Sequence, residues 1–298
     1  MLTSSIPAPP WNEIHLGPLA IRLYALAILI GVVVAATWSD RRWLRRGGTA
    51  GDITAITIAG VPGGIIGARL YHVATDPELF YGHWGRIFDV WKGGLGIPGA
   101  MIGGVLAGAV VARHRRLPIP ALLDVVAPTF PLAQAIGRFG NYFNQELFGR
   151  PSTLPWALHV DPQFRPPGFS LAATFHPTFA YEALWNLVVV AVVLTAERRR
   201  RVRTGYLFAV FVGSYFFGRF WIEGLRIDHA NRIAGLRVNE WVSLVVVAVA
   251  AGVLVRGRRR FLVDFDAHPA ELGPIVDPQP QAYAVPAPTA TDRPEEPS

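Results

Sequence analysis

Four polar residues repeat at helical spacing near the end of an apolar segment. Tyr215, Arg219, Glu223 and Arg226 follow one another at intervals of four, four and three residues. At about 100° per residue, a helix places all of them within about 80° of arc, on one face. Guanidinium groups on such a stripe can bind a phosphate, and the carboxylate can hold one of them in orientation. A purely structural ion pair between Arg219 and Glu223 is the alternative interpretation of this spacing.

A second polar stretch closes another apolar run. Residues 137–150 read GRFGNYFNQELFGR. A charge at mid-helix in lipid costs at least ~2.5–3.5 kcal/mol, so Arg138 is expected to have a function beyond anchoring the helix by snorkelling. If the helix continued, Arg138, Asn141, Gln145 and Gly149 would share a second polar face. The glycines of the stretch serve either close helix packing or the approach of backbone amides to a phosphate.

The composition is that of a membrane protein. Of the 298 residues, 51% are hydrophobic and 16% are charged, whereas soluble proteins have about 25% charged residues. The 28 Lys and Arg residues fall in short clusters between apolar runs rather than on one basic face, so we expect no nucleic-acid partner. There is no Cys, which excludes disulfides and a Cys nucleophile. His72 and His83 lack the spacing of metal ligands, and we predict neither a metal nor a cofactor.

Hydropathy predicts an all-α, polytopic membrane protein with about seven transmembrane helices. The apolar segments are 19–37, 53–71, 93–111, 121–139, 178–194, 205–222 and 240–255. They define a membrane domain over residues 19–260. We expect a short extracytoplasmic segment at 1–18, without the basic start of a cleavable signal peptide, and a disordered cytoplasmic tail at 261–298.

The loops predict the direction of the chain. Arginine clusters lie at 41–46, 113–116, 198–203 and 256–260, in alternate loops, and the other loops carry fewer basic residues over greater lengths. The positive-inside rule places the clusters in the cytoplasm, with the N-terminus outside and the C-terminus inside. The long loop at 141–177 then forms a small extracytoplasmic cap.

This orientation brings polar residues of six segments to one depth, near the outer leaflet. They include Tyr24, Arg69, Lys92 at the glycine-rich start of the third segment, Arg138, His176 with Glu182 and, on the stripe, Arg219. A phospholipid headgroup would lie at that depth. Two members have other interpretations, because Tyr24 suits an aromatic belt and His176, which precedes a proline, suits a helix cap.

Taken together, these blocks resemble the bacterial prolipoprotein diacylglyceryl transferases. The resemblance runs from about Leu16 to Val255 and rests on RLY at 22–24, GAR at 67–69, the glycine-rich start of the third segment, the stretch 137–150, HPT at 176–178 with YE at 181–182, and the stripe. It implies an enzyme of the bacterial plasma membrane that acts without a cofactor near the outer leaflet. Its partners would be membrane lipid, phosphatidylglycerol as donor, and prolipoproteins with a lipobox cysteine as acceptor.

The resemblance and the convergence of polar residues give two sets of site residues. The set that we expect to be catalytic is Arg138, Arg219, Glu223 and Tyr24. The set that we expect to bind the lipid is Arg138, Asn141, Glu146, Gly149, Tyr215, Arg226, Arg69 and His176. The arginines would stabilise charge on a departing phosphate as sulfur attacks the glyceryl carbon, a thioether forms and glycerol 1-phosphate leaves.

One position departs from the family. Many members carry a histidine, proposed as a general base, where this chain has Pro98. Either another group acts as the base, or none is needed, because a thiol near neutral pH already has a few per cent thiolate. A transporter or flippase for an anionic lipid, and a non-catalytic lipid-binding scaffold, are the alternative functions. The apolar inner halves of the segments count against a transporter.

Overall fold

Helices dominate the part of the chain that the computed structural model describes, which is residues 5–17, 19–90, 93–94, 96–199, 205–228 and 230–266. The α-helices are α1 (Leu23–Arg45), α2 (Asp52–Thr75), α3 (Ile97–His114), α4 (Ile119–Val126), α5 (Thr129–Phe143), α6 (Thr178–Arg198), α7 (Leu207–Leu225) and α8 (Val238–Asp266). Short 3-10 helices are η1 (Pro77–Phe80), η2 (Trp84–Phe88) and η4 (Pro162–Phe164). The strands are β1 (Glu13–Leu16), β2 (Leu19–Arg22), β3 (Leu158–His159), β4 (Thr174–Phe175), β5 (Arg232–Ile233) and β6 (Leu236–Arg237).

Several of these helices can cross a membrane. Among the described residues, α1, α2, α6 and residues 238–257 of α8 are long and apolar enough, and α4 with α5 makes a fifth span if the bent pair is counted as one. Helices α3 and α7 form where the third and sixth apolar segments were predicted. The chain is therefore a mostly helical, multi-pass membrane protein.

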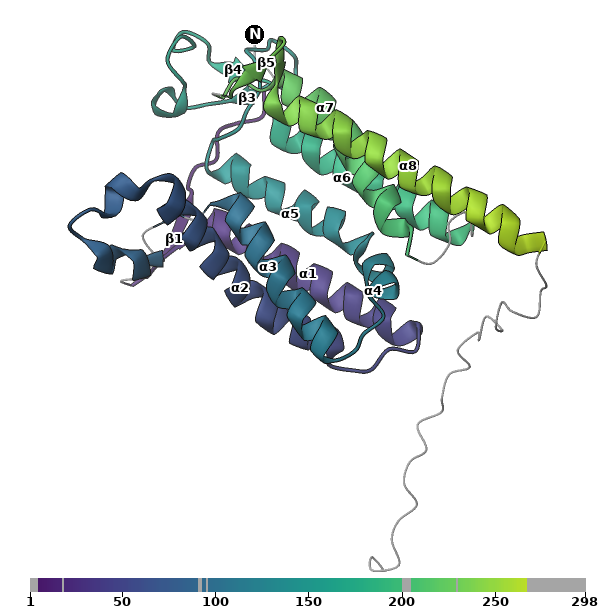
Figure 1. Cartoon of the computed structure of the whole chain (residues 1–298). Helices are drawn as coiled ribbons and strands as arrows, with labels where there is room; N and C mark the ends of the chain where they lie inside the picture. The colour runs from purple at the N-terminus through teal and green to yellow at the C-terminus, as the bar shows by residue number, and fades with distance from the viewer. Residues whose placement is uncertain are drawn as a thin grey trace, which may run out of the picture.

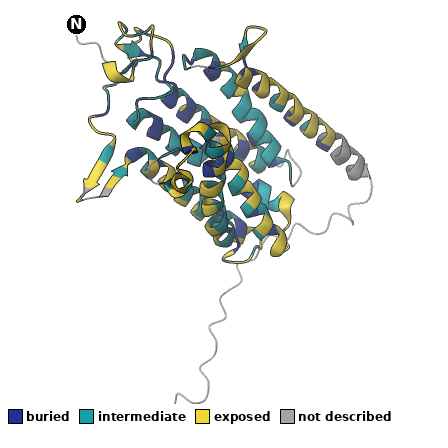
Figure 2. Ribbon diagram, turned by 60° about the vertical axis from the view of Figure 1, so that its left-hand side comes forward, coloured by how far each residue is buried: buried dark blue, intermediate teal, exposed yellow. Residues whose placement is uncertain are grey.

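The helices form two groups joined by α5 (Figure 1). Helices α1, α2 and α3 lie on one side, and α6, α7 and α8 lie side by side on the other. Helix α5 packs against both α1 and α6. Exposed residues run along the helices (Figure 2). Many of them are large and apolar, as a lipid-facing surface requires, among them Ile28, Leu29, Ile58, Leu106, Leu184 and Val245.

Glycines allow the closest helix contact, between α2 and α3. A Cβ added at Gly67 would lie 2.9 Å from the Gly103 Cα and closer still to the Gly99 carbonyl oxygen. Gly31 plays the same part where α1 meets α5, since a Cβ there would lie 2.9 Å from the Ala133 carbonyl oxygen. Close packing is therefore the role of these glycines.

The structure differs from the predicted helices in three details. The first helix begins at Leu23, because Leu19–Arg22 form β2, which pairs antiparallel with β1. The fourth segment is not one straight helix: the chain bends by 41° between α4 and α5, where Pro128 lacks the N–H that would continue the helix. The proposed second face also fails, because α5 ends at Phe143 and Gln145 has a φ of 49°.

The long loop after α5 folds on itself beside the ends of α6 and α7 (Figure 1). Strands β3 and β4 pair antiparallel within it, and the hairpin β5–β6 lies nearby. Phe148, Leu158, Val160, Phe175 and Phe179 form an apolar cluster under these strands. The loop is therefore a small packed unit at one end of the bundle. The described residues are therefore mostly but not entirely α-helical, because they also contain the two-stranded sheets β1–β2, β3–β4 and β5–β6.

The last helix extends past the predicted end of the membrane domain, because α8 continues to Asp266. The rest of the predicted tail, residues 267–298, lies outside the described residues, as do residues 1–4 and Pro18 of the predicted N-terminal segment.

Candidate functional site

Helix α7 carries the first three residues of the stripe. Arg219 and Glu223, one turn apart, form an ion pair with Nη2 and Oε2 2.6 Å apart, and the Glu223 side chain is fully buried. The helix ends at Leu225. Arg226 therefore leaves it with an extended backbone, and its Nη1 lies 3.9 Å from the same Glu223 oxygen.

Glu182 on α6 joins two of the predicted site arginines. Its Oε1 accepts a hydrogen bond from Arg219 Nη1 at 2.8 Å, and its Oε2 lies 2.6 Å from Arg138 Nη2. All these side chains are mostly buried, with Glu182 at 5% exposure. A buried charge is stable only when it is paired. One carboxylate thus holds a guanidinium from α5 beside one from α7.

The stretch after Arg138 continues this network. Arg138 Nη1 donates a long hydrogen bond to Asn141 Oδ1, at 3.4 Å, and Asn141 Nδ2 donates to Glu146 Oε1 at 2.8 Å. Asn144 also donates to that Glu146 oxygen, at 3.3 Å. The turn that brings Glu146 back is made by Gln145 and Leu147, both with positive φ.

Tyr24 approaches the same place from α1. Its ring packs on Gly140, where an added Cβ would lie 2.6 Å from Tyr24 Cδ2. The charges of Glu146 and Arg138 both act on the Tyr24 hydroxyl group. Gly140 therefore has a steric reason to lack a side chain, and Tyr24 lies beside the network rather than only at an interface.

Gly149 and His176 connect the loop to the end of α7. The Gly149 N–H donates to the His176 carbonyl at 2.9 Å, and Gly149 forms an antiparallel bridge with Arg226. A Cβ at Gly149 would lie 2.8 Å from the His176 Cβ. The imidazole Nδ1 of His176 lies 3.1 Å from the Tyr181 hydroxyl oxygen, so it faces Tyr181 rather than the arginines.

Arg237, just before α8, extends the network to the surface. Its Nε lies 3.0 Å from Glu223 Oε1, and its Nη2 donates to Asp228 Oδ2 at 2.9 Å. Arg226 Nε donates to the other Asp228 oxygen at 2.7 Å. Partial burial by itself raises the pKa of Asp228, but the hydrogen bond and charge of Arg226 and the charge of Arg237 outweigh it and hold the pKa below its ordinary value. Asp228 is thus ionised between two guanidinium groups.

Two other predicted site residues are Tyr215, which adjoins this network, and Arg69, which does not. Tyr215 is one turn before Arg219, interacts with its charge and packs on the apolar core beside α6. Arg69 lies elsewhere: its guanidinium donates to the carbonyls of Ile87, Gly93 and Gly94 and lies 5.2 Å from the Phe80 ring centroid. Its contacts are those of a residue that holds the loop between α2 and α3.

Sequence reasoning placed Glu182 in the polar layer but left it, with Asp228 and Arg237, out of the two sets of site residues. Glu182 carried a usable signal, because it is a charged residue inside an apolar segment. Arg237 and Asp228 carried none, since they lie in a polar loop where a charge is ordinary. Pro98, where the resemblance leads us to expect a histidine, lies in the first turn of α3 and is exposed.

A second ionic network lies at the opposite end of the bundle. Arg42 donates to Glu197 at 2.9 Å, and Arg46 contacts both Glu197 and Asp124. Asp124 accepts the N–H of Leu207 at 3.0 Å, which ties α4 to the start of α7. Between the two networks lies an apolar core of Val189 and Val193 from α6, Leu207 and Phe211 from α7, and Ala127 after α4, and the polar Asn186 is beside Glu182.

The apolar outer faces and the buried chain of alternating arginines and carboxylates define a membrane protein with a buried ionic network at one end of its helix bundle. Residues 12–256 match the family model of the prolipoprotein diacylglyceryl transferases. The chain therefore belongs to this family and is a transferase.

Named relatives cover most of the chain. Phosphatidylglycerol–prolipoprotein diacylglyceryl transferase 2 of Streptomyces coelicolor is 47% identical over 258 residues, which are 86% of this chain and 81% of the relative. The enzyme of Frankia alni is 48% identical over 91% of this chain and 72% of its own length. That of Cutibacterium acnes is 46% identical over 86% of this chain and 88% of its own length.

Proposed function

We propose that this protein transfers the diacylglyceryl group of phosphatidylglycerol to the lipobox cysteine of a prolipoprotein. The observation that carries the proposal is the pair of guanidinium groups of Arg138 and Arg219 on one buried carboxylate, Glu182, in a chain of this family. Such a pair suits a phosphodiester held at the membrane surface. The names of the relatives give the donor and the acceptor.

The reaction is a displacement at carbon. The cysteine thiolate attacks the glyceryl CH₂ that carries the phosphate ester, so a C–S bond forms and the C–O bond breaks. The electron pair of that bond stays on the phosphate oxygen, glycerol 1-phosphate leaves, and the thiol proton passes to water. Negative charge on the phosphate grows during this step, and fixed cations stabilise it most in the transition state.

The contacts support a role for each of these residues. Arg138 and Arg219 bind the phosphate and stabilise its departure. Glu182 and Glu223 hold the two guanidinium groups in orientation through ion pairs of 2.6 to 2.8 Å. Tyr24 is the fourth residue of the predicted catalytic set, and it lies beside Arg138, where the phosphate would bind.

Further residues bind the lipid headgroup or hold the loop around it. Asn141 and Glu146 extend the hydrogen-bond chain from Arg138. Gly149, His176, Tyr215 and Arg226 line its edges through the contacts described above. Arg69 would bind lipid only by giving up its loop carbonyls, and of these roles it has the least support.

For the topology we propose seven transmembrane helices, with the bent pair α4–α5 counted as one, the N-terminus outside and the C-terminus in the cytoplasm. The arginine clusters in alternate loops support this direction. The packed loop at 141–177 would then be an extracytoplasmic cap, the domain division would be 1–18, 19–260 and 261–298, and the site would lie near the outer leaflet of the bacterial plasma membrane.

A transporter of anionic lipids has less support. From Glu182 to Glu197 along α6 is about 22 Å, and the core between these residues is almost wholly apolar. A lipid headgroup crossing that layer would lose its hydration without polar partners.

The test is a transfer assay with purified protein, phosphatidylglycerol vesicles and a lipobox peptide. We expect a thioether-linked diacylglyceryl peptide and an equal amount of glycerol 1-phosphate, both detected by mass spectrometry. A peptide with serine in place of the lipobox cysteine is the control and should remain unmodified. Movement of labelled lipid across the vesicle without any thioether product would favour the transporter instead.

A further inference from the structure

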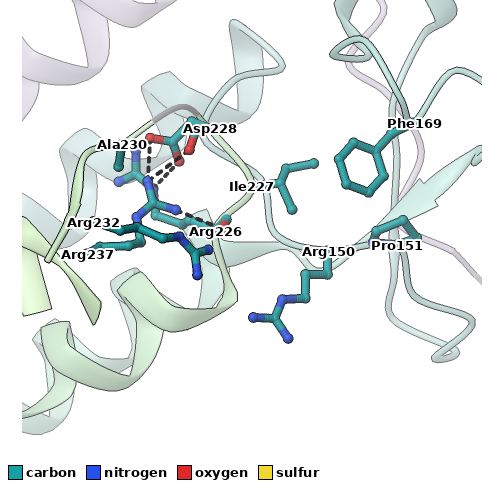
Figure 3. Close-up of a pocket in the computed structure, with 9 residues that line it drawn as sticks. All are labelled: Arg150, Pro151, Phe169, Arg226, Ile227, Asp228, Ala230, Arg232 and Arg237. Atoms are coloured by element: carbon teal, nitrogen blue, oxygen red, sulfur yellow. Dashed lines mark hydrogen bonds and ion pairs between the residues drawn. The ribbon is translucent and has the colours of Figure 1, made fainter. Parts of the chain in front are cut away.

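A pocket beside the buried network has its own charge pattern. It has a volume of about 300 Å³ and lies between the loop that follows α7 and the loop that begins at Arg150. Arginines 226, 232 and 237 gather around Asp228 on one side, and Phe169 and Ile227 lie on the other (Figure 3). Arg150 also lines the pocket, so its lining holds four arginines and one carboxylate.

The four cations differ in their partners. Arg226 and Arg237 are buried and already pair with Asp228 and Glu223. Arg150 and Arg232 are exposed, and among the described residues neither has a carboxylate within ion-pair distance. Two unpaired cations beside two paired ones leave the pocket with a positive potential that an anion would neutralise.

A neighbouring pocket has the opposite composition. It measures about 650 Å³, shares Ile227 and Asp228 with the first, and is lined by Glu13, Glu146 and Arg22. Ile227 and Asp228 thus lie between a basic pocket and a pocket with more carboxylates than arginines. An anion that leaves the buried network would therefore favour the basic pocket.

We propose that the basic pocket binds the phosphomonoester product, glycerol 1-phosphate, before it leaves for water. This inference rests on the proposed function. The donor lipid is a phosphodiester with one negative charge, whereas the phosphomonoester carries about −1.5 to −2 at neutral pH. Arg226 and Arg237 touch both Glu223 and the pocket, so the product gains cationic partners as it moves outward from Arg219. A volume of about 300 Å³ suits a small polar molecule and excludes two acyl chains.

The test measures binding rather than turnover. Titration calorimetry with the full-length protein in detergent gives the Kd for glycerol 1-phosphate, for inorganic phosphate and for a short-chain phosphatidylglycerol. In the double variant Arg150→Gln with Arg232→Gln, the Kd for glycerol 1-phosphate should rise about three- to tenfold, as expected for two exposed cations. The Kd for inorganic phosphate should rise as well, and that for phosphatidylglycerol should stay unchanged.

Two further variants make the result specific. Arg232→Gln alone should give part of the effect without touching the hydrogen bond from Arg150 to the Gly224 carbonyl. Arg86→Gln removes an exposed arginine that does not line the pocket and should have no effect. An equal effect of Arg86→Gln, an unchanged Kd in the double variant, or an equal loss of phosphatidylglycerol binding would each overturn the pocket assignment.

The transfer assay separates this inference from the proposed function. A protein that forms the thioether while the double variant binds glycerol 1-phosphate normally contradicts the pocket alone. A protein that forms no thioether contradicts the proposed function, whatever it binds.

Discussion

Glu182 has two oxygens and two guanidinium partners, so neither Arg138 nor Arg219 can turn fully to a ligand without weakening an ion pair. A bound phosphate would take up the free donors of both side chains and remain between them. In the proposed reaction, Glu182 would neutralise part of the charge of the two arginines before the lipid binds. It would also hold both guanidinium groups in position before the reaction begins.

The first prediction concerns Arg138. We expect Arg138→Ala to lower kcat by about 10²–10³, the usual loss for one donor to a developing anion. Arg138→Lys should also be poor, because lysine cannot contact Glu182 and the phosphate with a planar fork. Initial rates of thioether formation check this, with Arg86→Ala as an exposed control. If Arg138→Ala keeps most of its activity and inserts normally, Arg138 only anchors α5.

The second prediction concerns the base. His176 faces Tyr181, and Pro98 stands at the family's histidine position. If thiolate formation is easy and phosphate departure is slow, His176→Gln should keep substantial activity and Pro98→His should add little. The rate should rise with pH toward the pKa of the substrate thiol, ordinarily about 8.5, which nearby arginines lower. A pH–rate profile of each variant checks this.

One result would assign the base to His176 instead. That result is a loss of activity in His176→Gln while binding of phosphatidylglycerol stays normal. Rescue of the loss by a higher pH would point the same way, because hydroxide then replaces the missing base.

At the scale of the elements, apolar runs predicted where the helices lie, but not how they begin, bend and end. Pro128 inside the fourth run was a readable signal for the bend. The strand Leu19–Arg22 was not readable, because its apolar residues continue directly into α1. The packing of the α2 glycines against those of α3 was not predicted, because it depends on which helices meet.

The third prediction tests this glycine contact. Gly103→Ala places a methyl group 2.9 Å from the Gly67 Cα and closer still to the Gly63 carbonyl, so α2 and α3 must separate. Overpacking of this kind costs about 1–3 kcal/mol of stability, and the Tm in detergent should fall. Gly60→Ala on the same seam is the matched control, because its Cβ would lie 3.6 Å from the Gly104 carbonyl oxygen. Equal Tm values for the two variants would mean that the contact is loose.

At the scale of the whole molecule, the site could be predicted only in part. Helical spacing brought Arg219 and Glu223 together, and loop charge placed Arg138 at the same depth. The contact through Glu182 required three helices to meet at one level, which depends on tertiary packing. Arg237 and Asp228 enter the network only because the loop after α7 folds back on the end of that helix.

The two ionic networks give the molecule two polar ends, and only the direction of the chain decides which end faces the cytoplasm. Arginines 42 and 46 belong to the basic cluster at 41–46, at the end of α1, and pair with Glu197, so the second network should be the cytoplasmic one. The site network, with its packed loop, should then face outward and meet the lipid headgroups of the outer leaflet.

The fourth prediction tests this direction. The chain has no Cys, so single cysteines need no altered background. Cysteines at Ser170 and His83 should react with a membrane-impermeant maleimide in intact cells. Cysteines at Thr49 and His114 should react only after the membrane is opened. All four positions are exposed, so access to reagent rather than burial decides the labelling. The reverse pattern would place the arginine pair of Arg138 and Arg219 near the inner leaflet, where a lipobox cysteine that has crossed the membrane would not reach it.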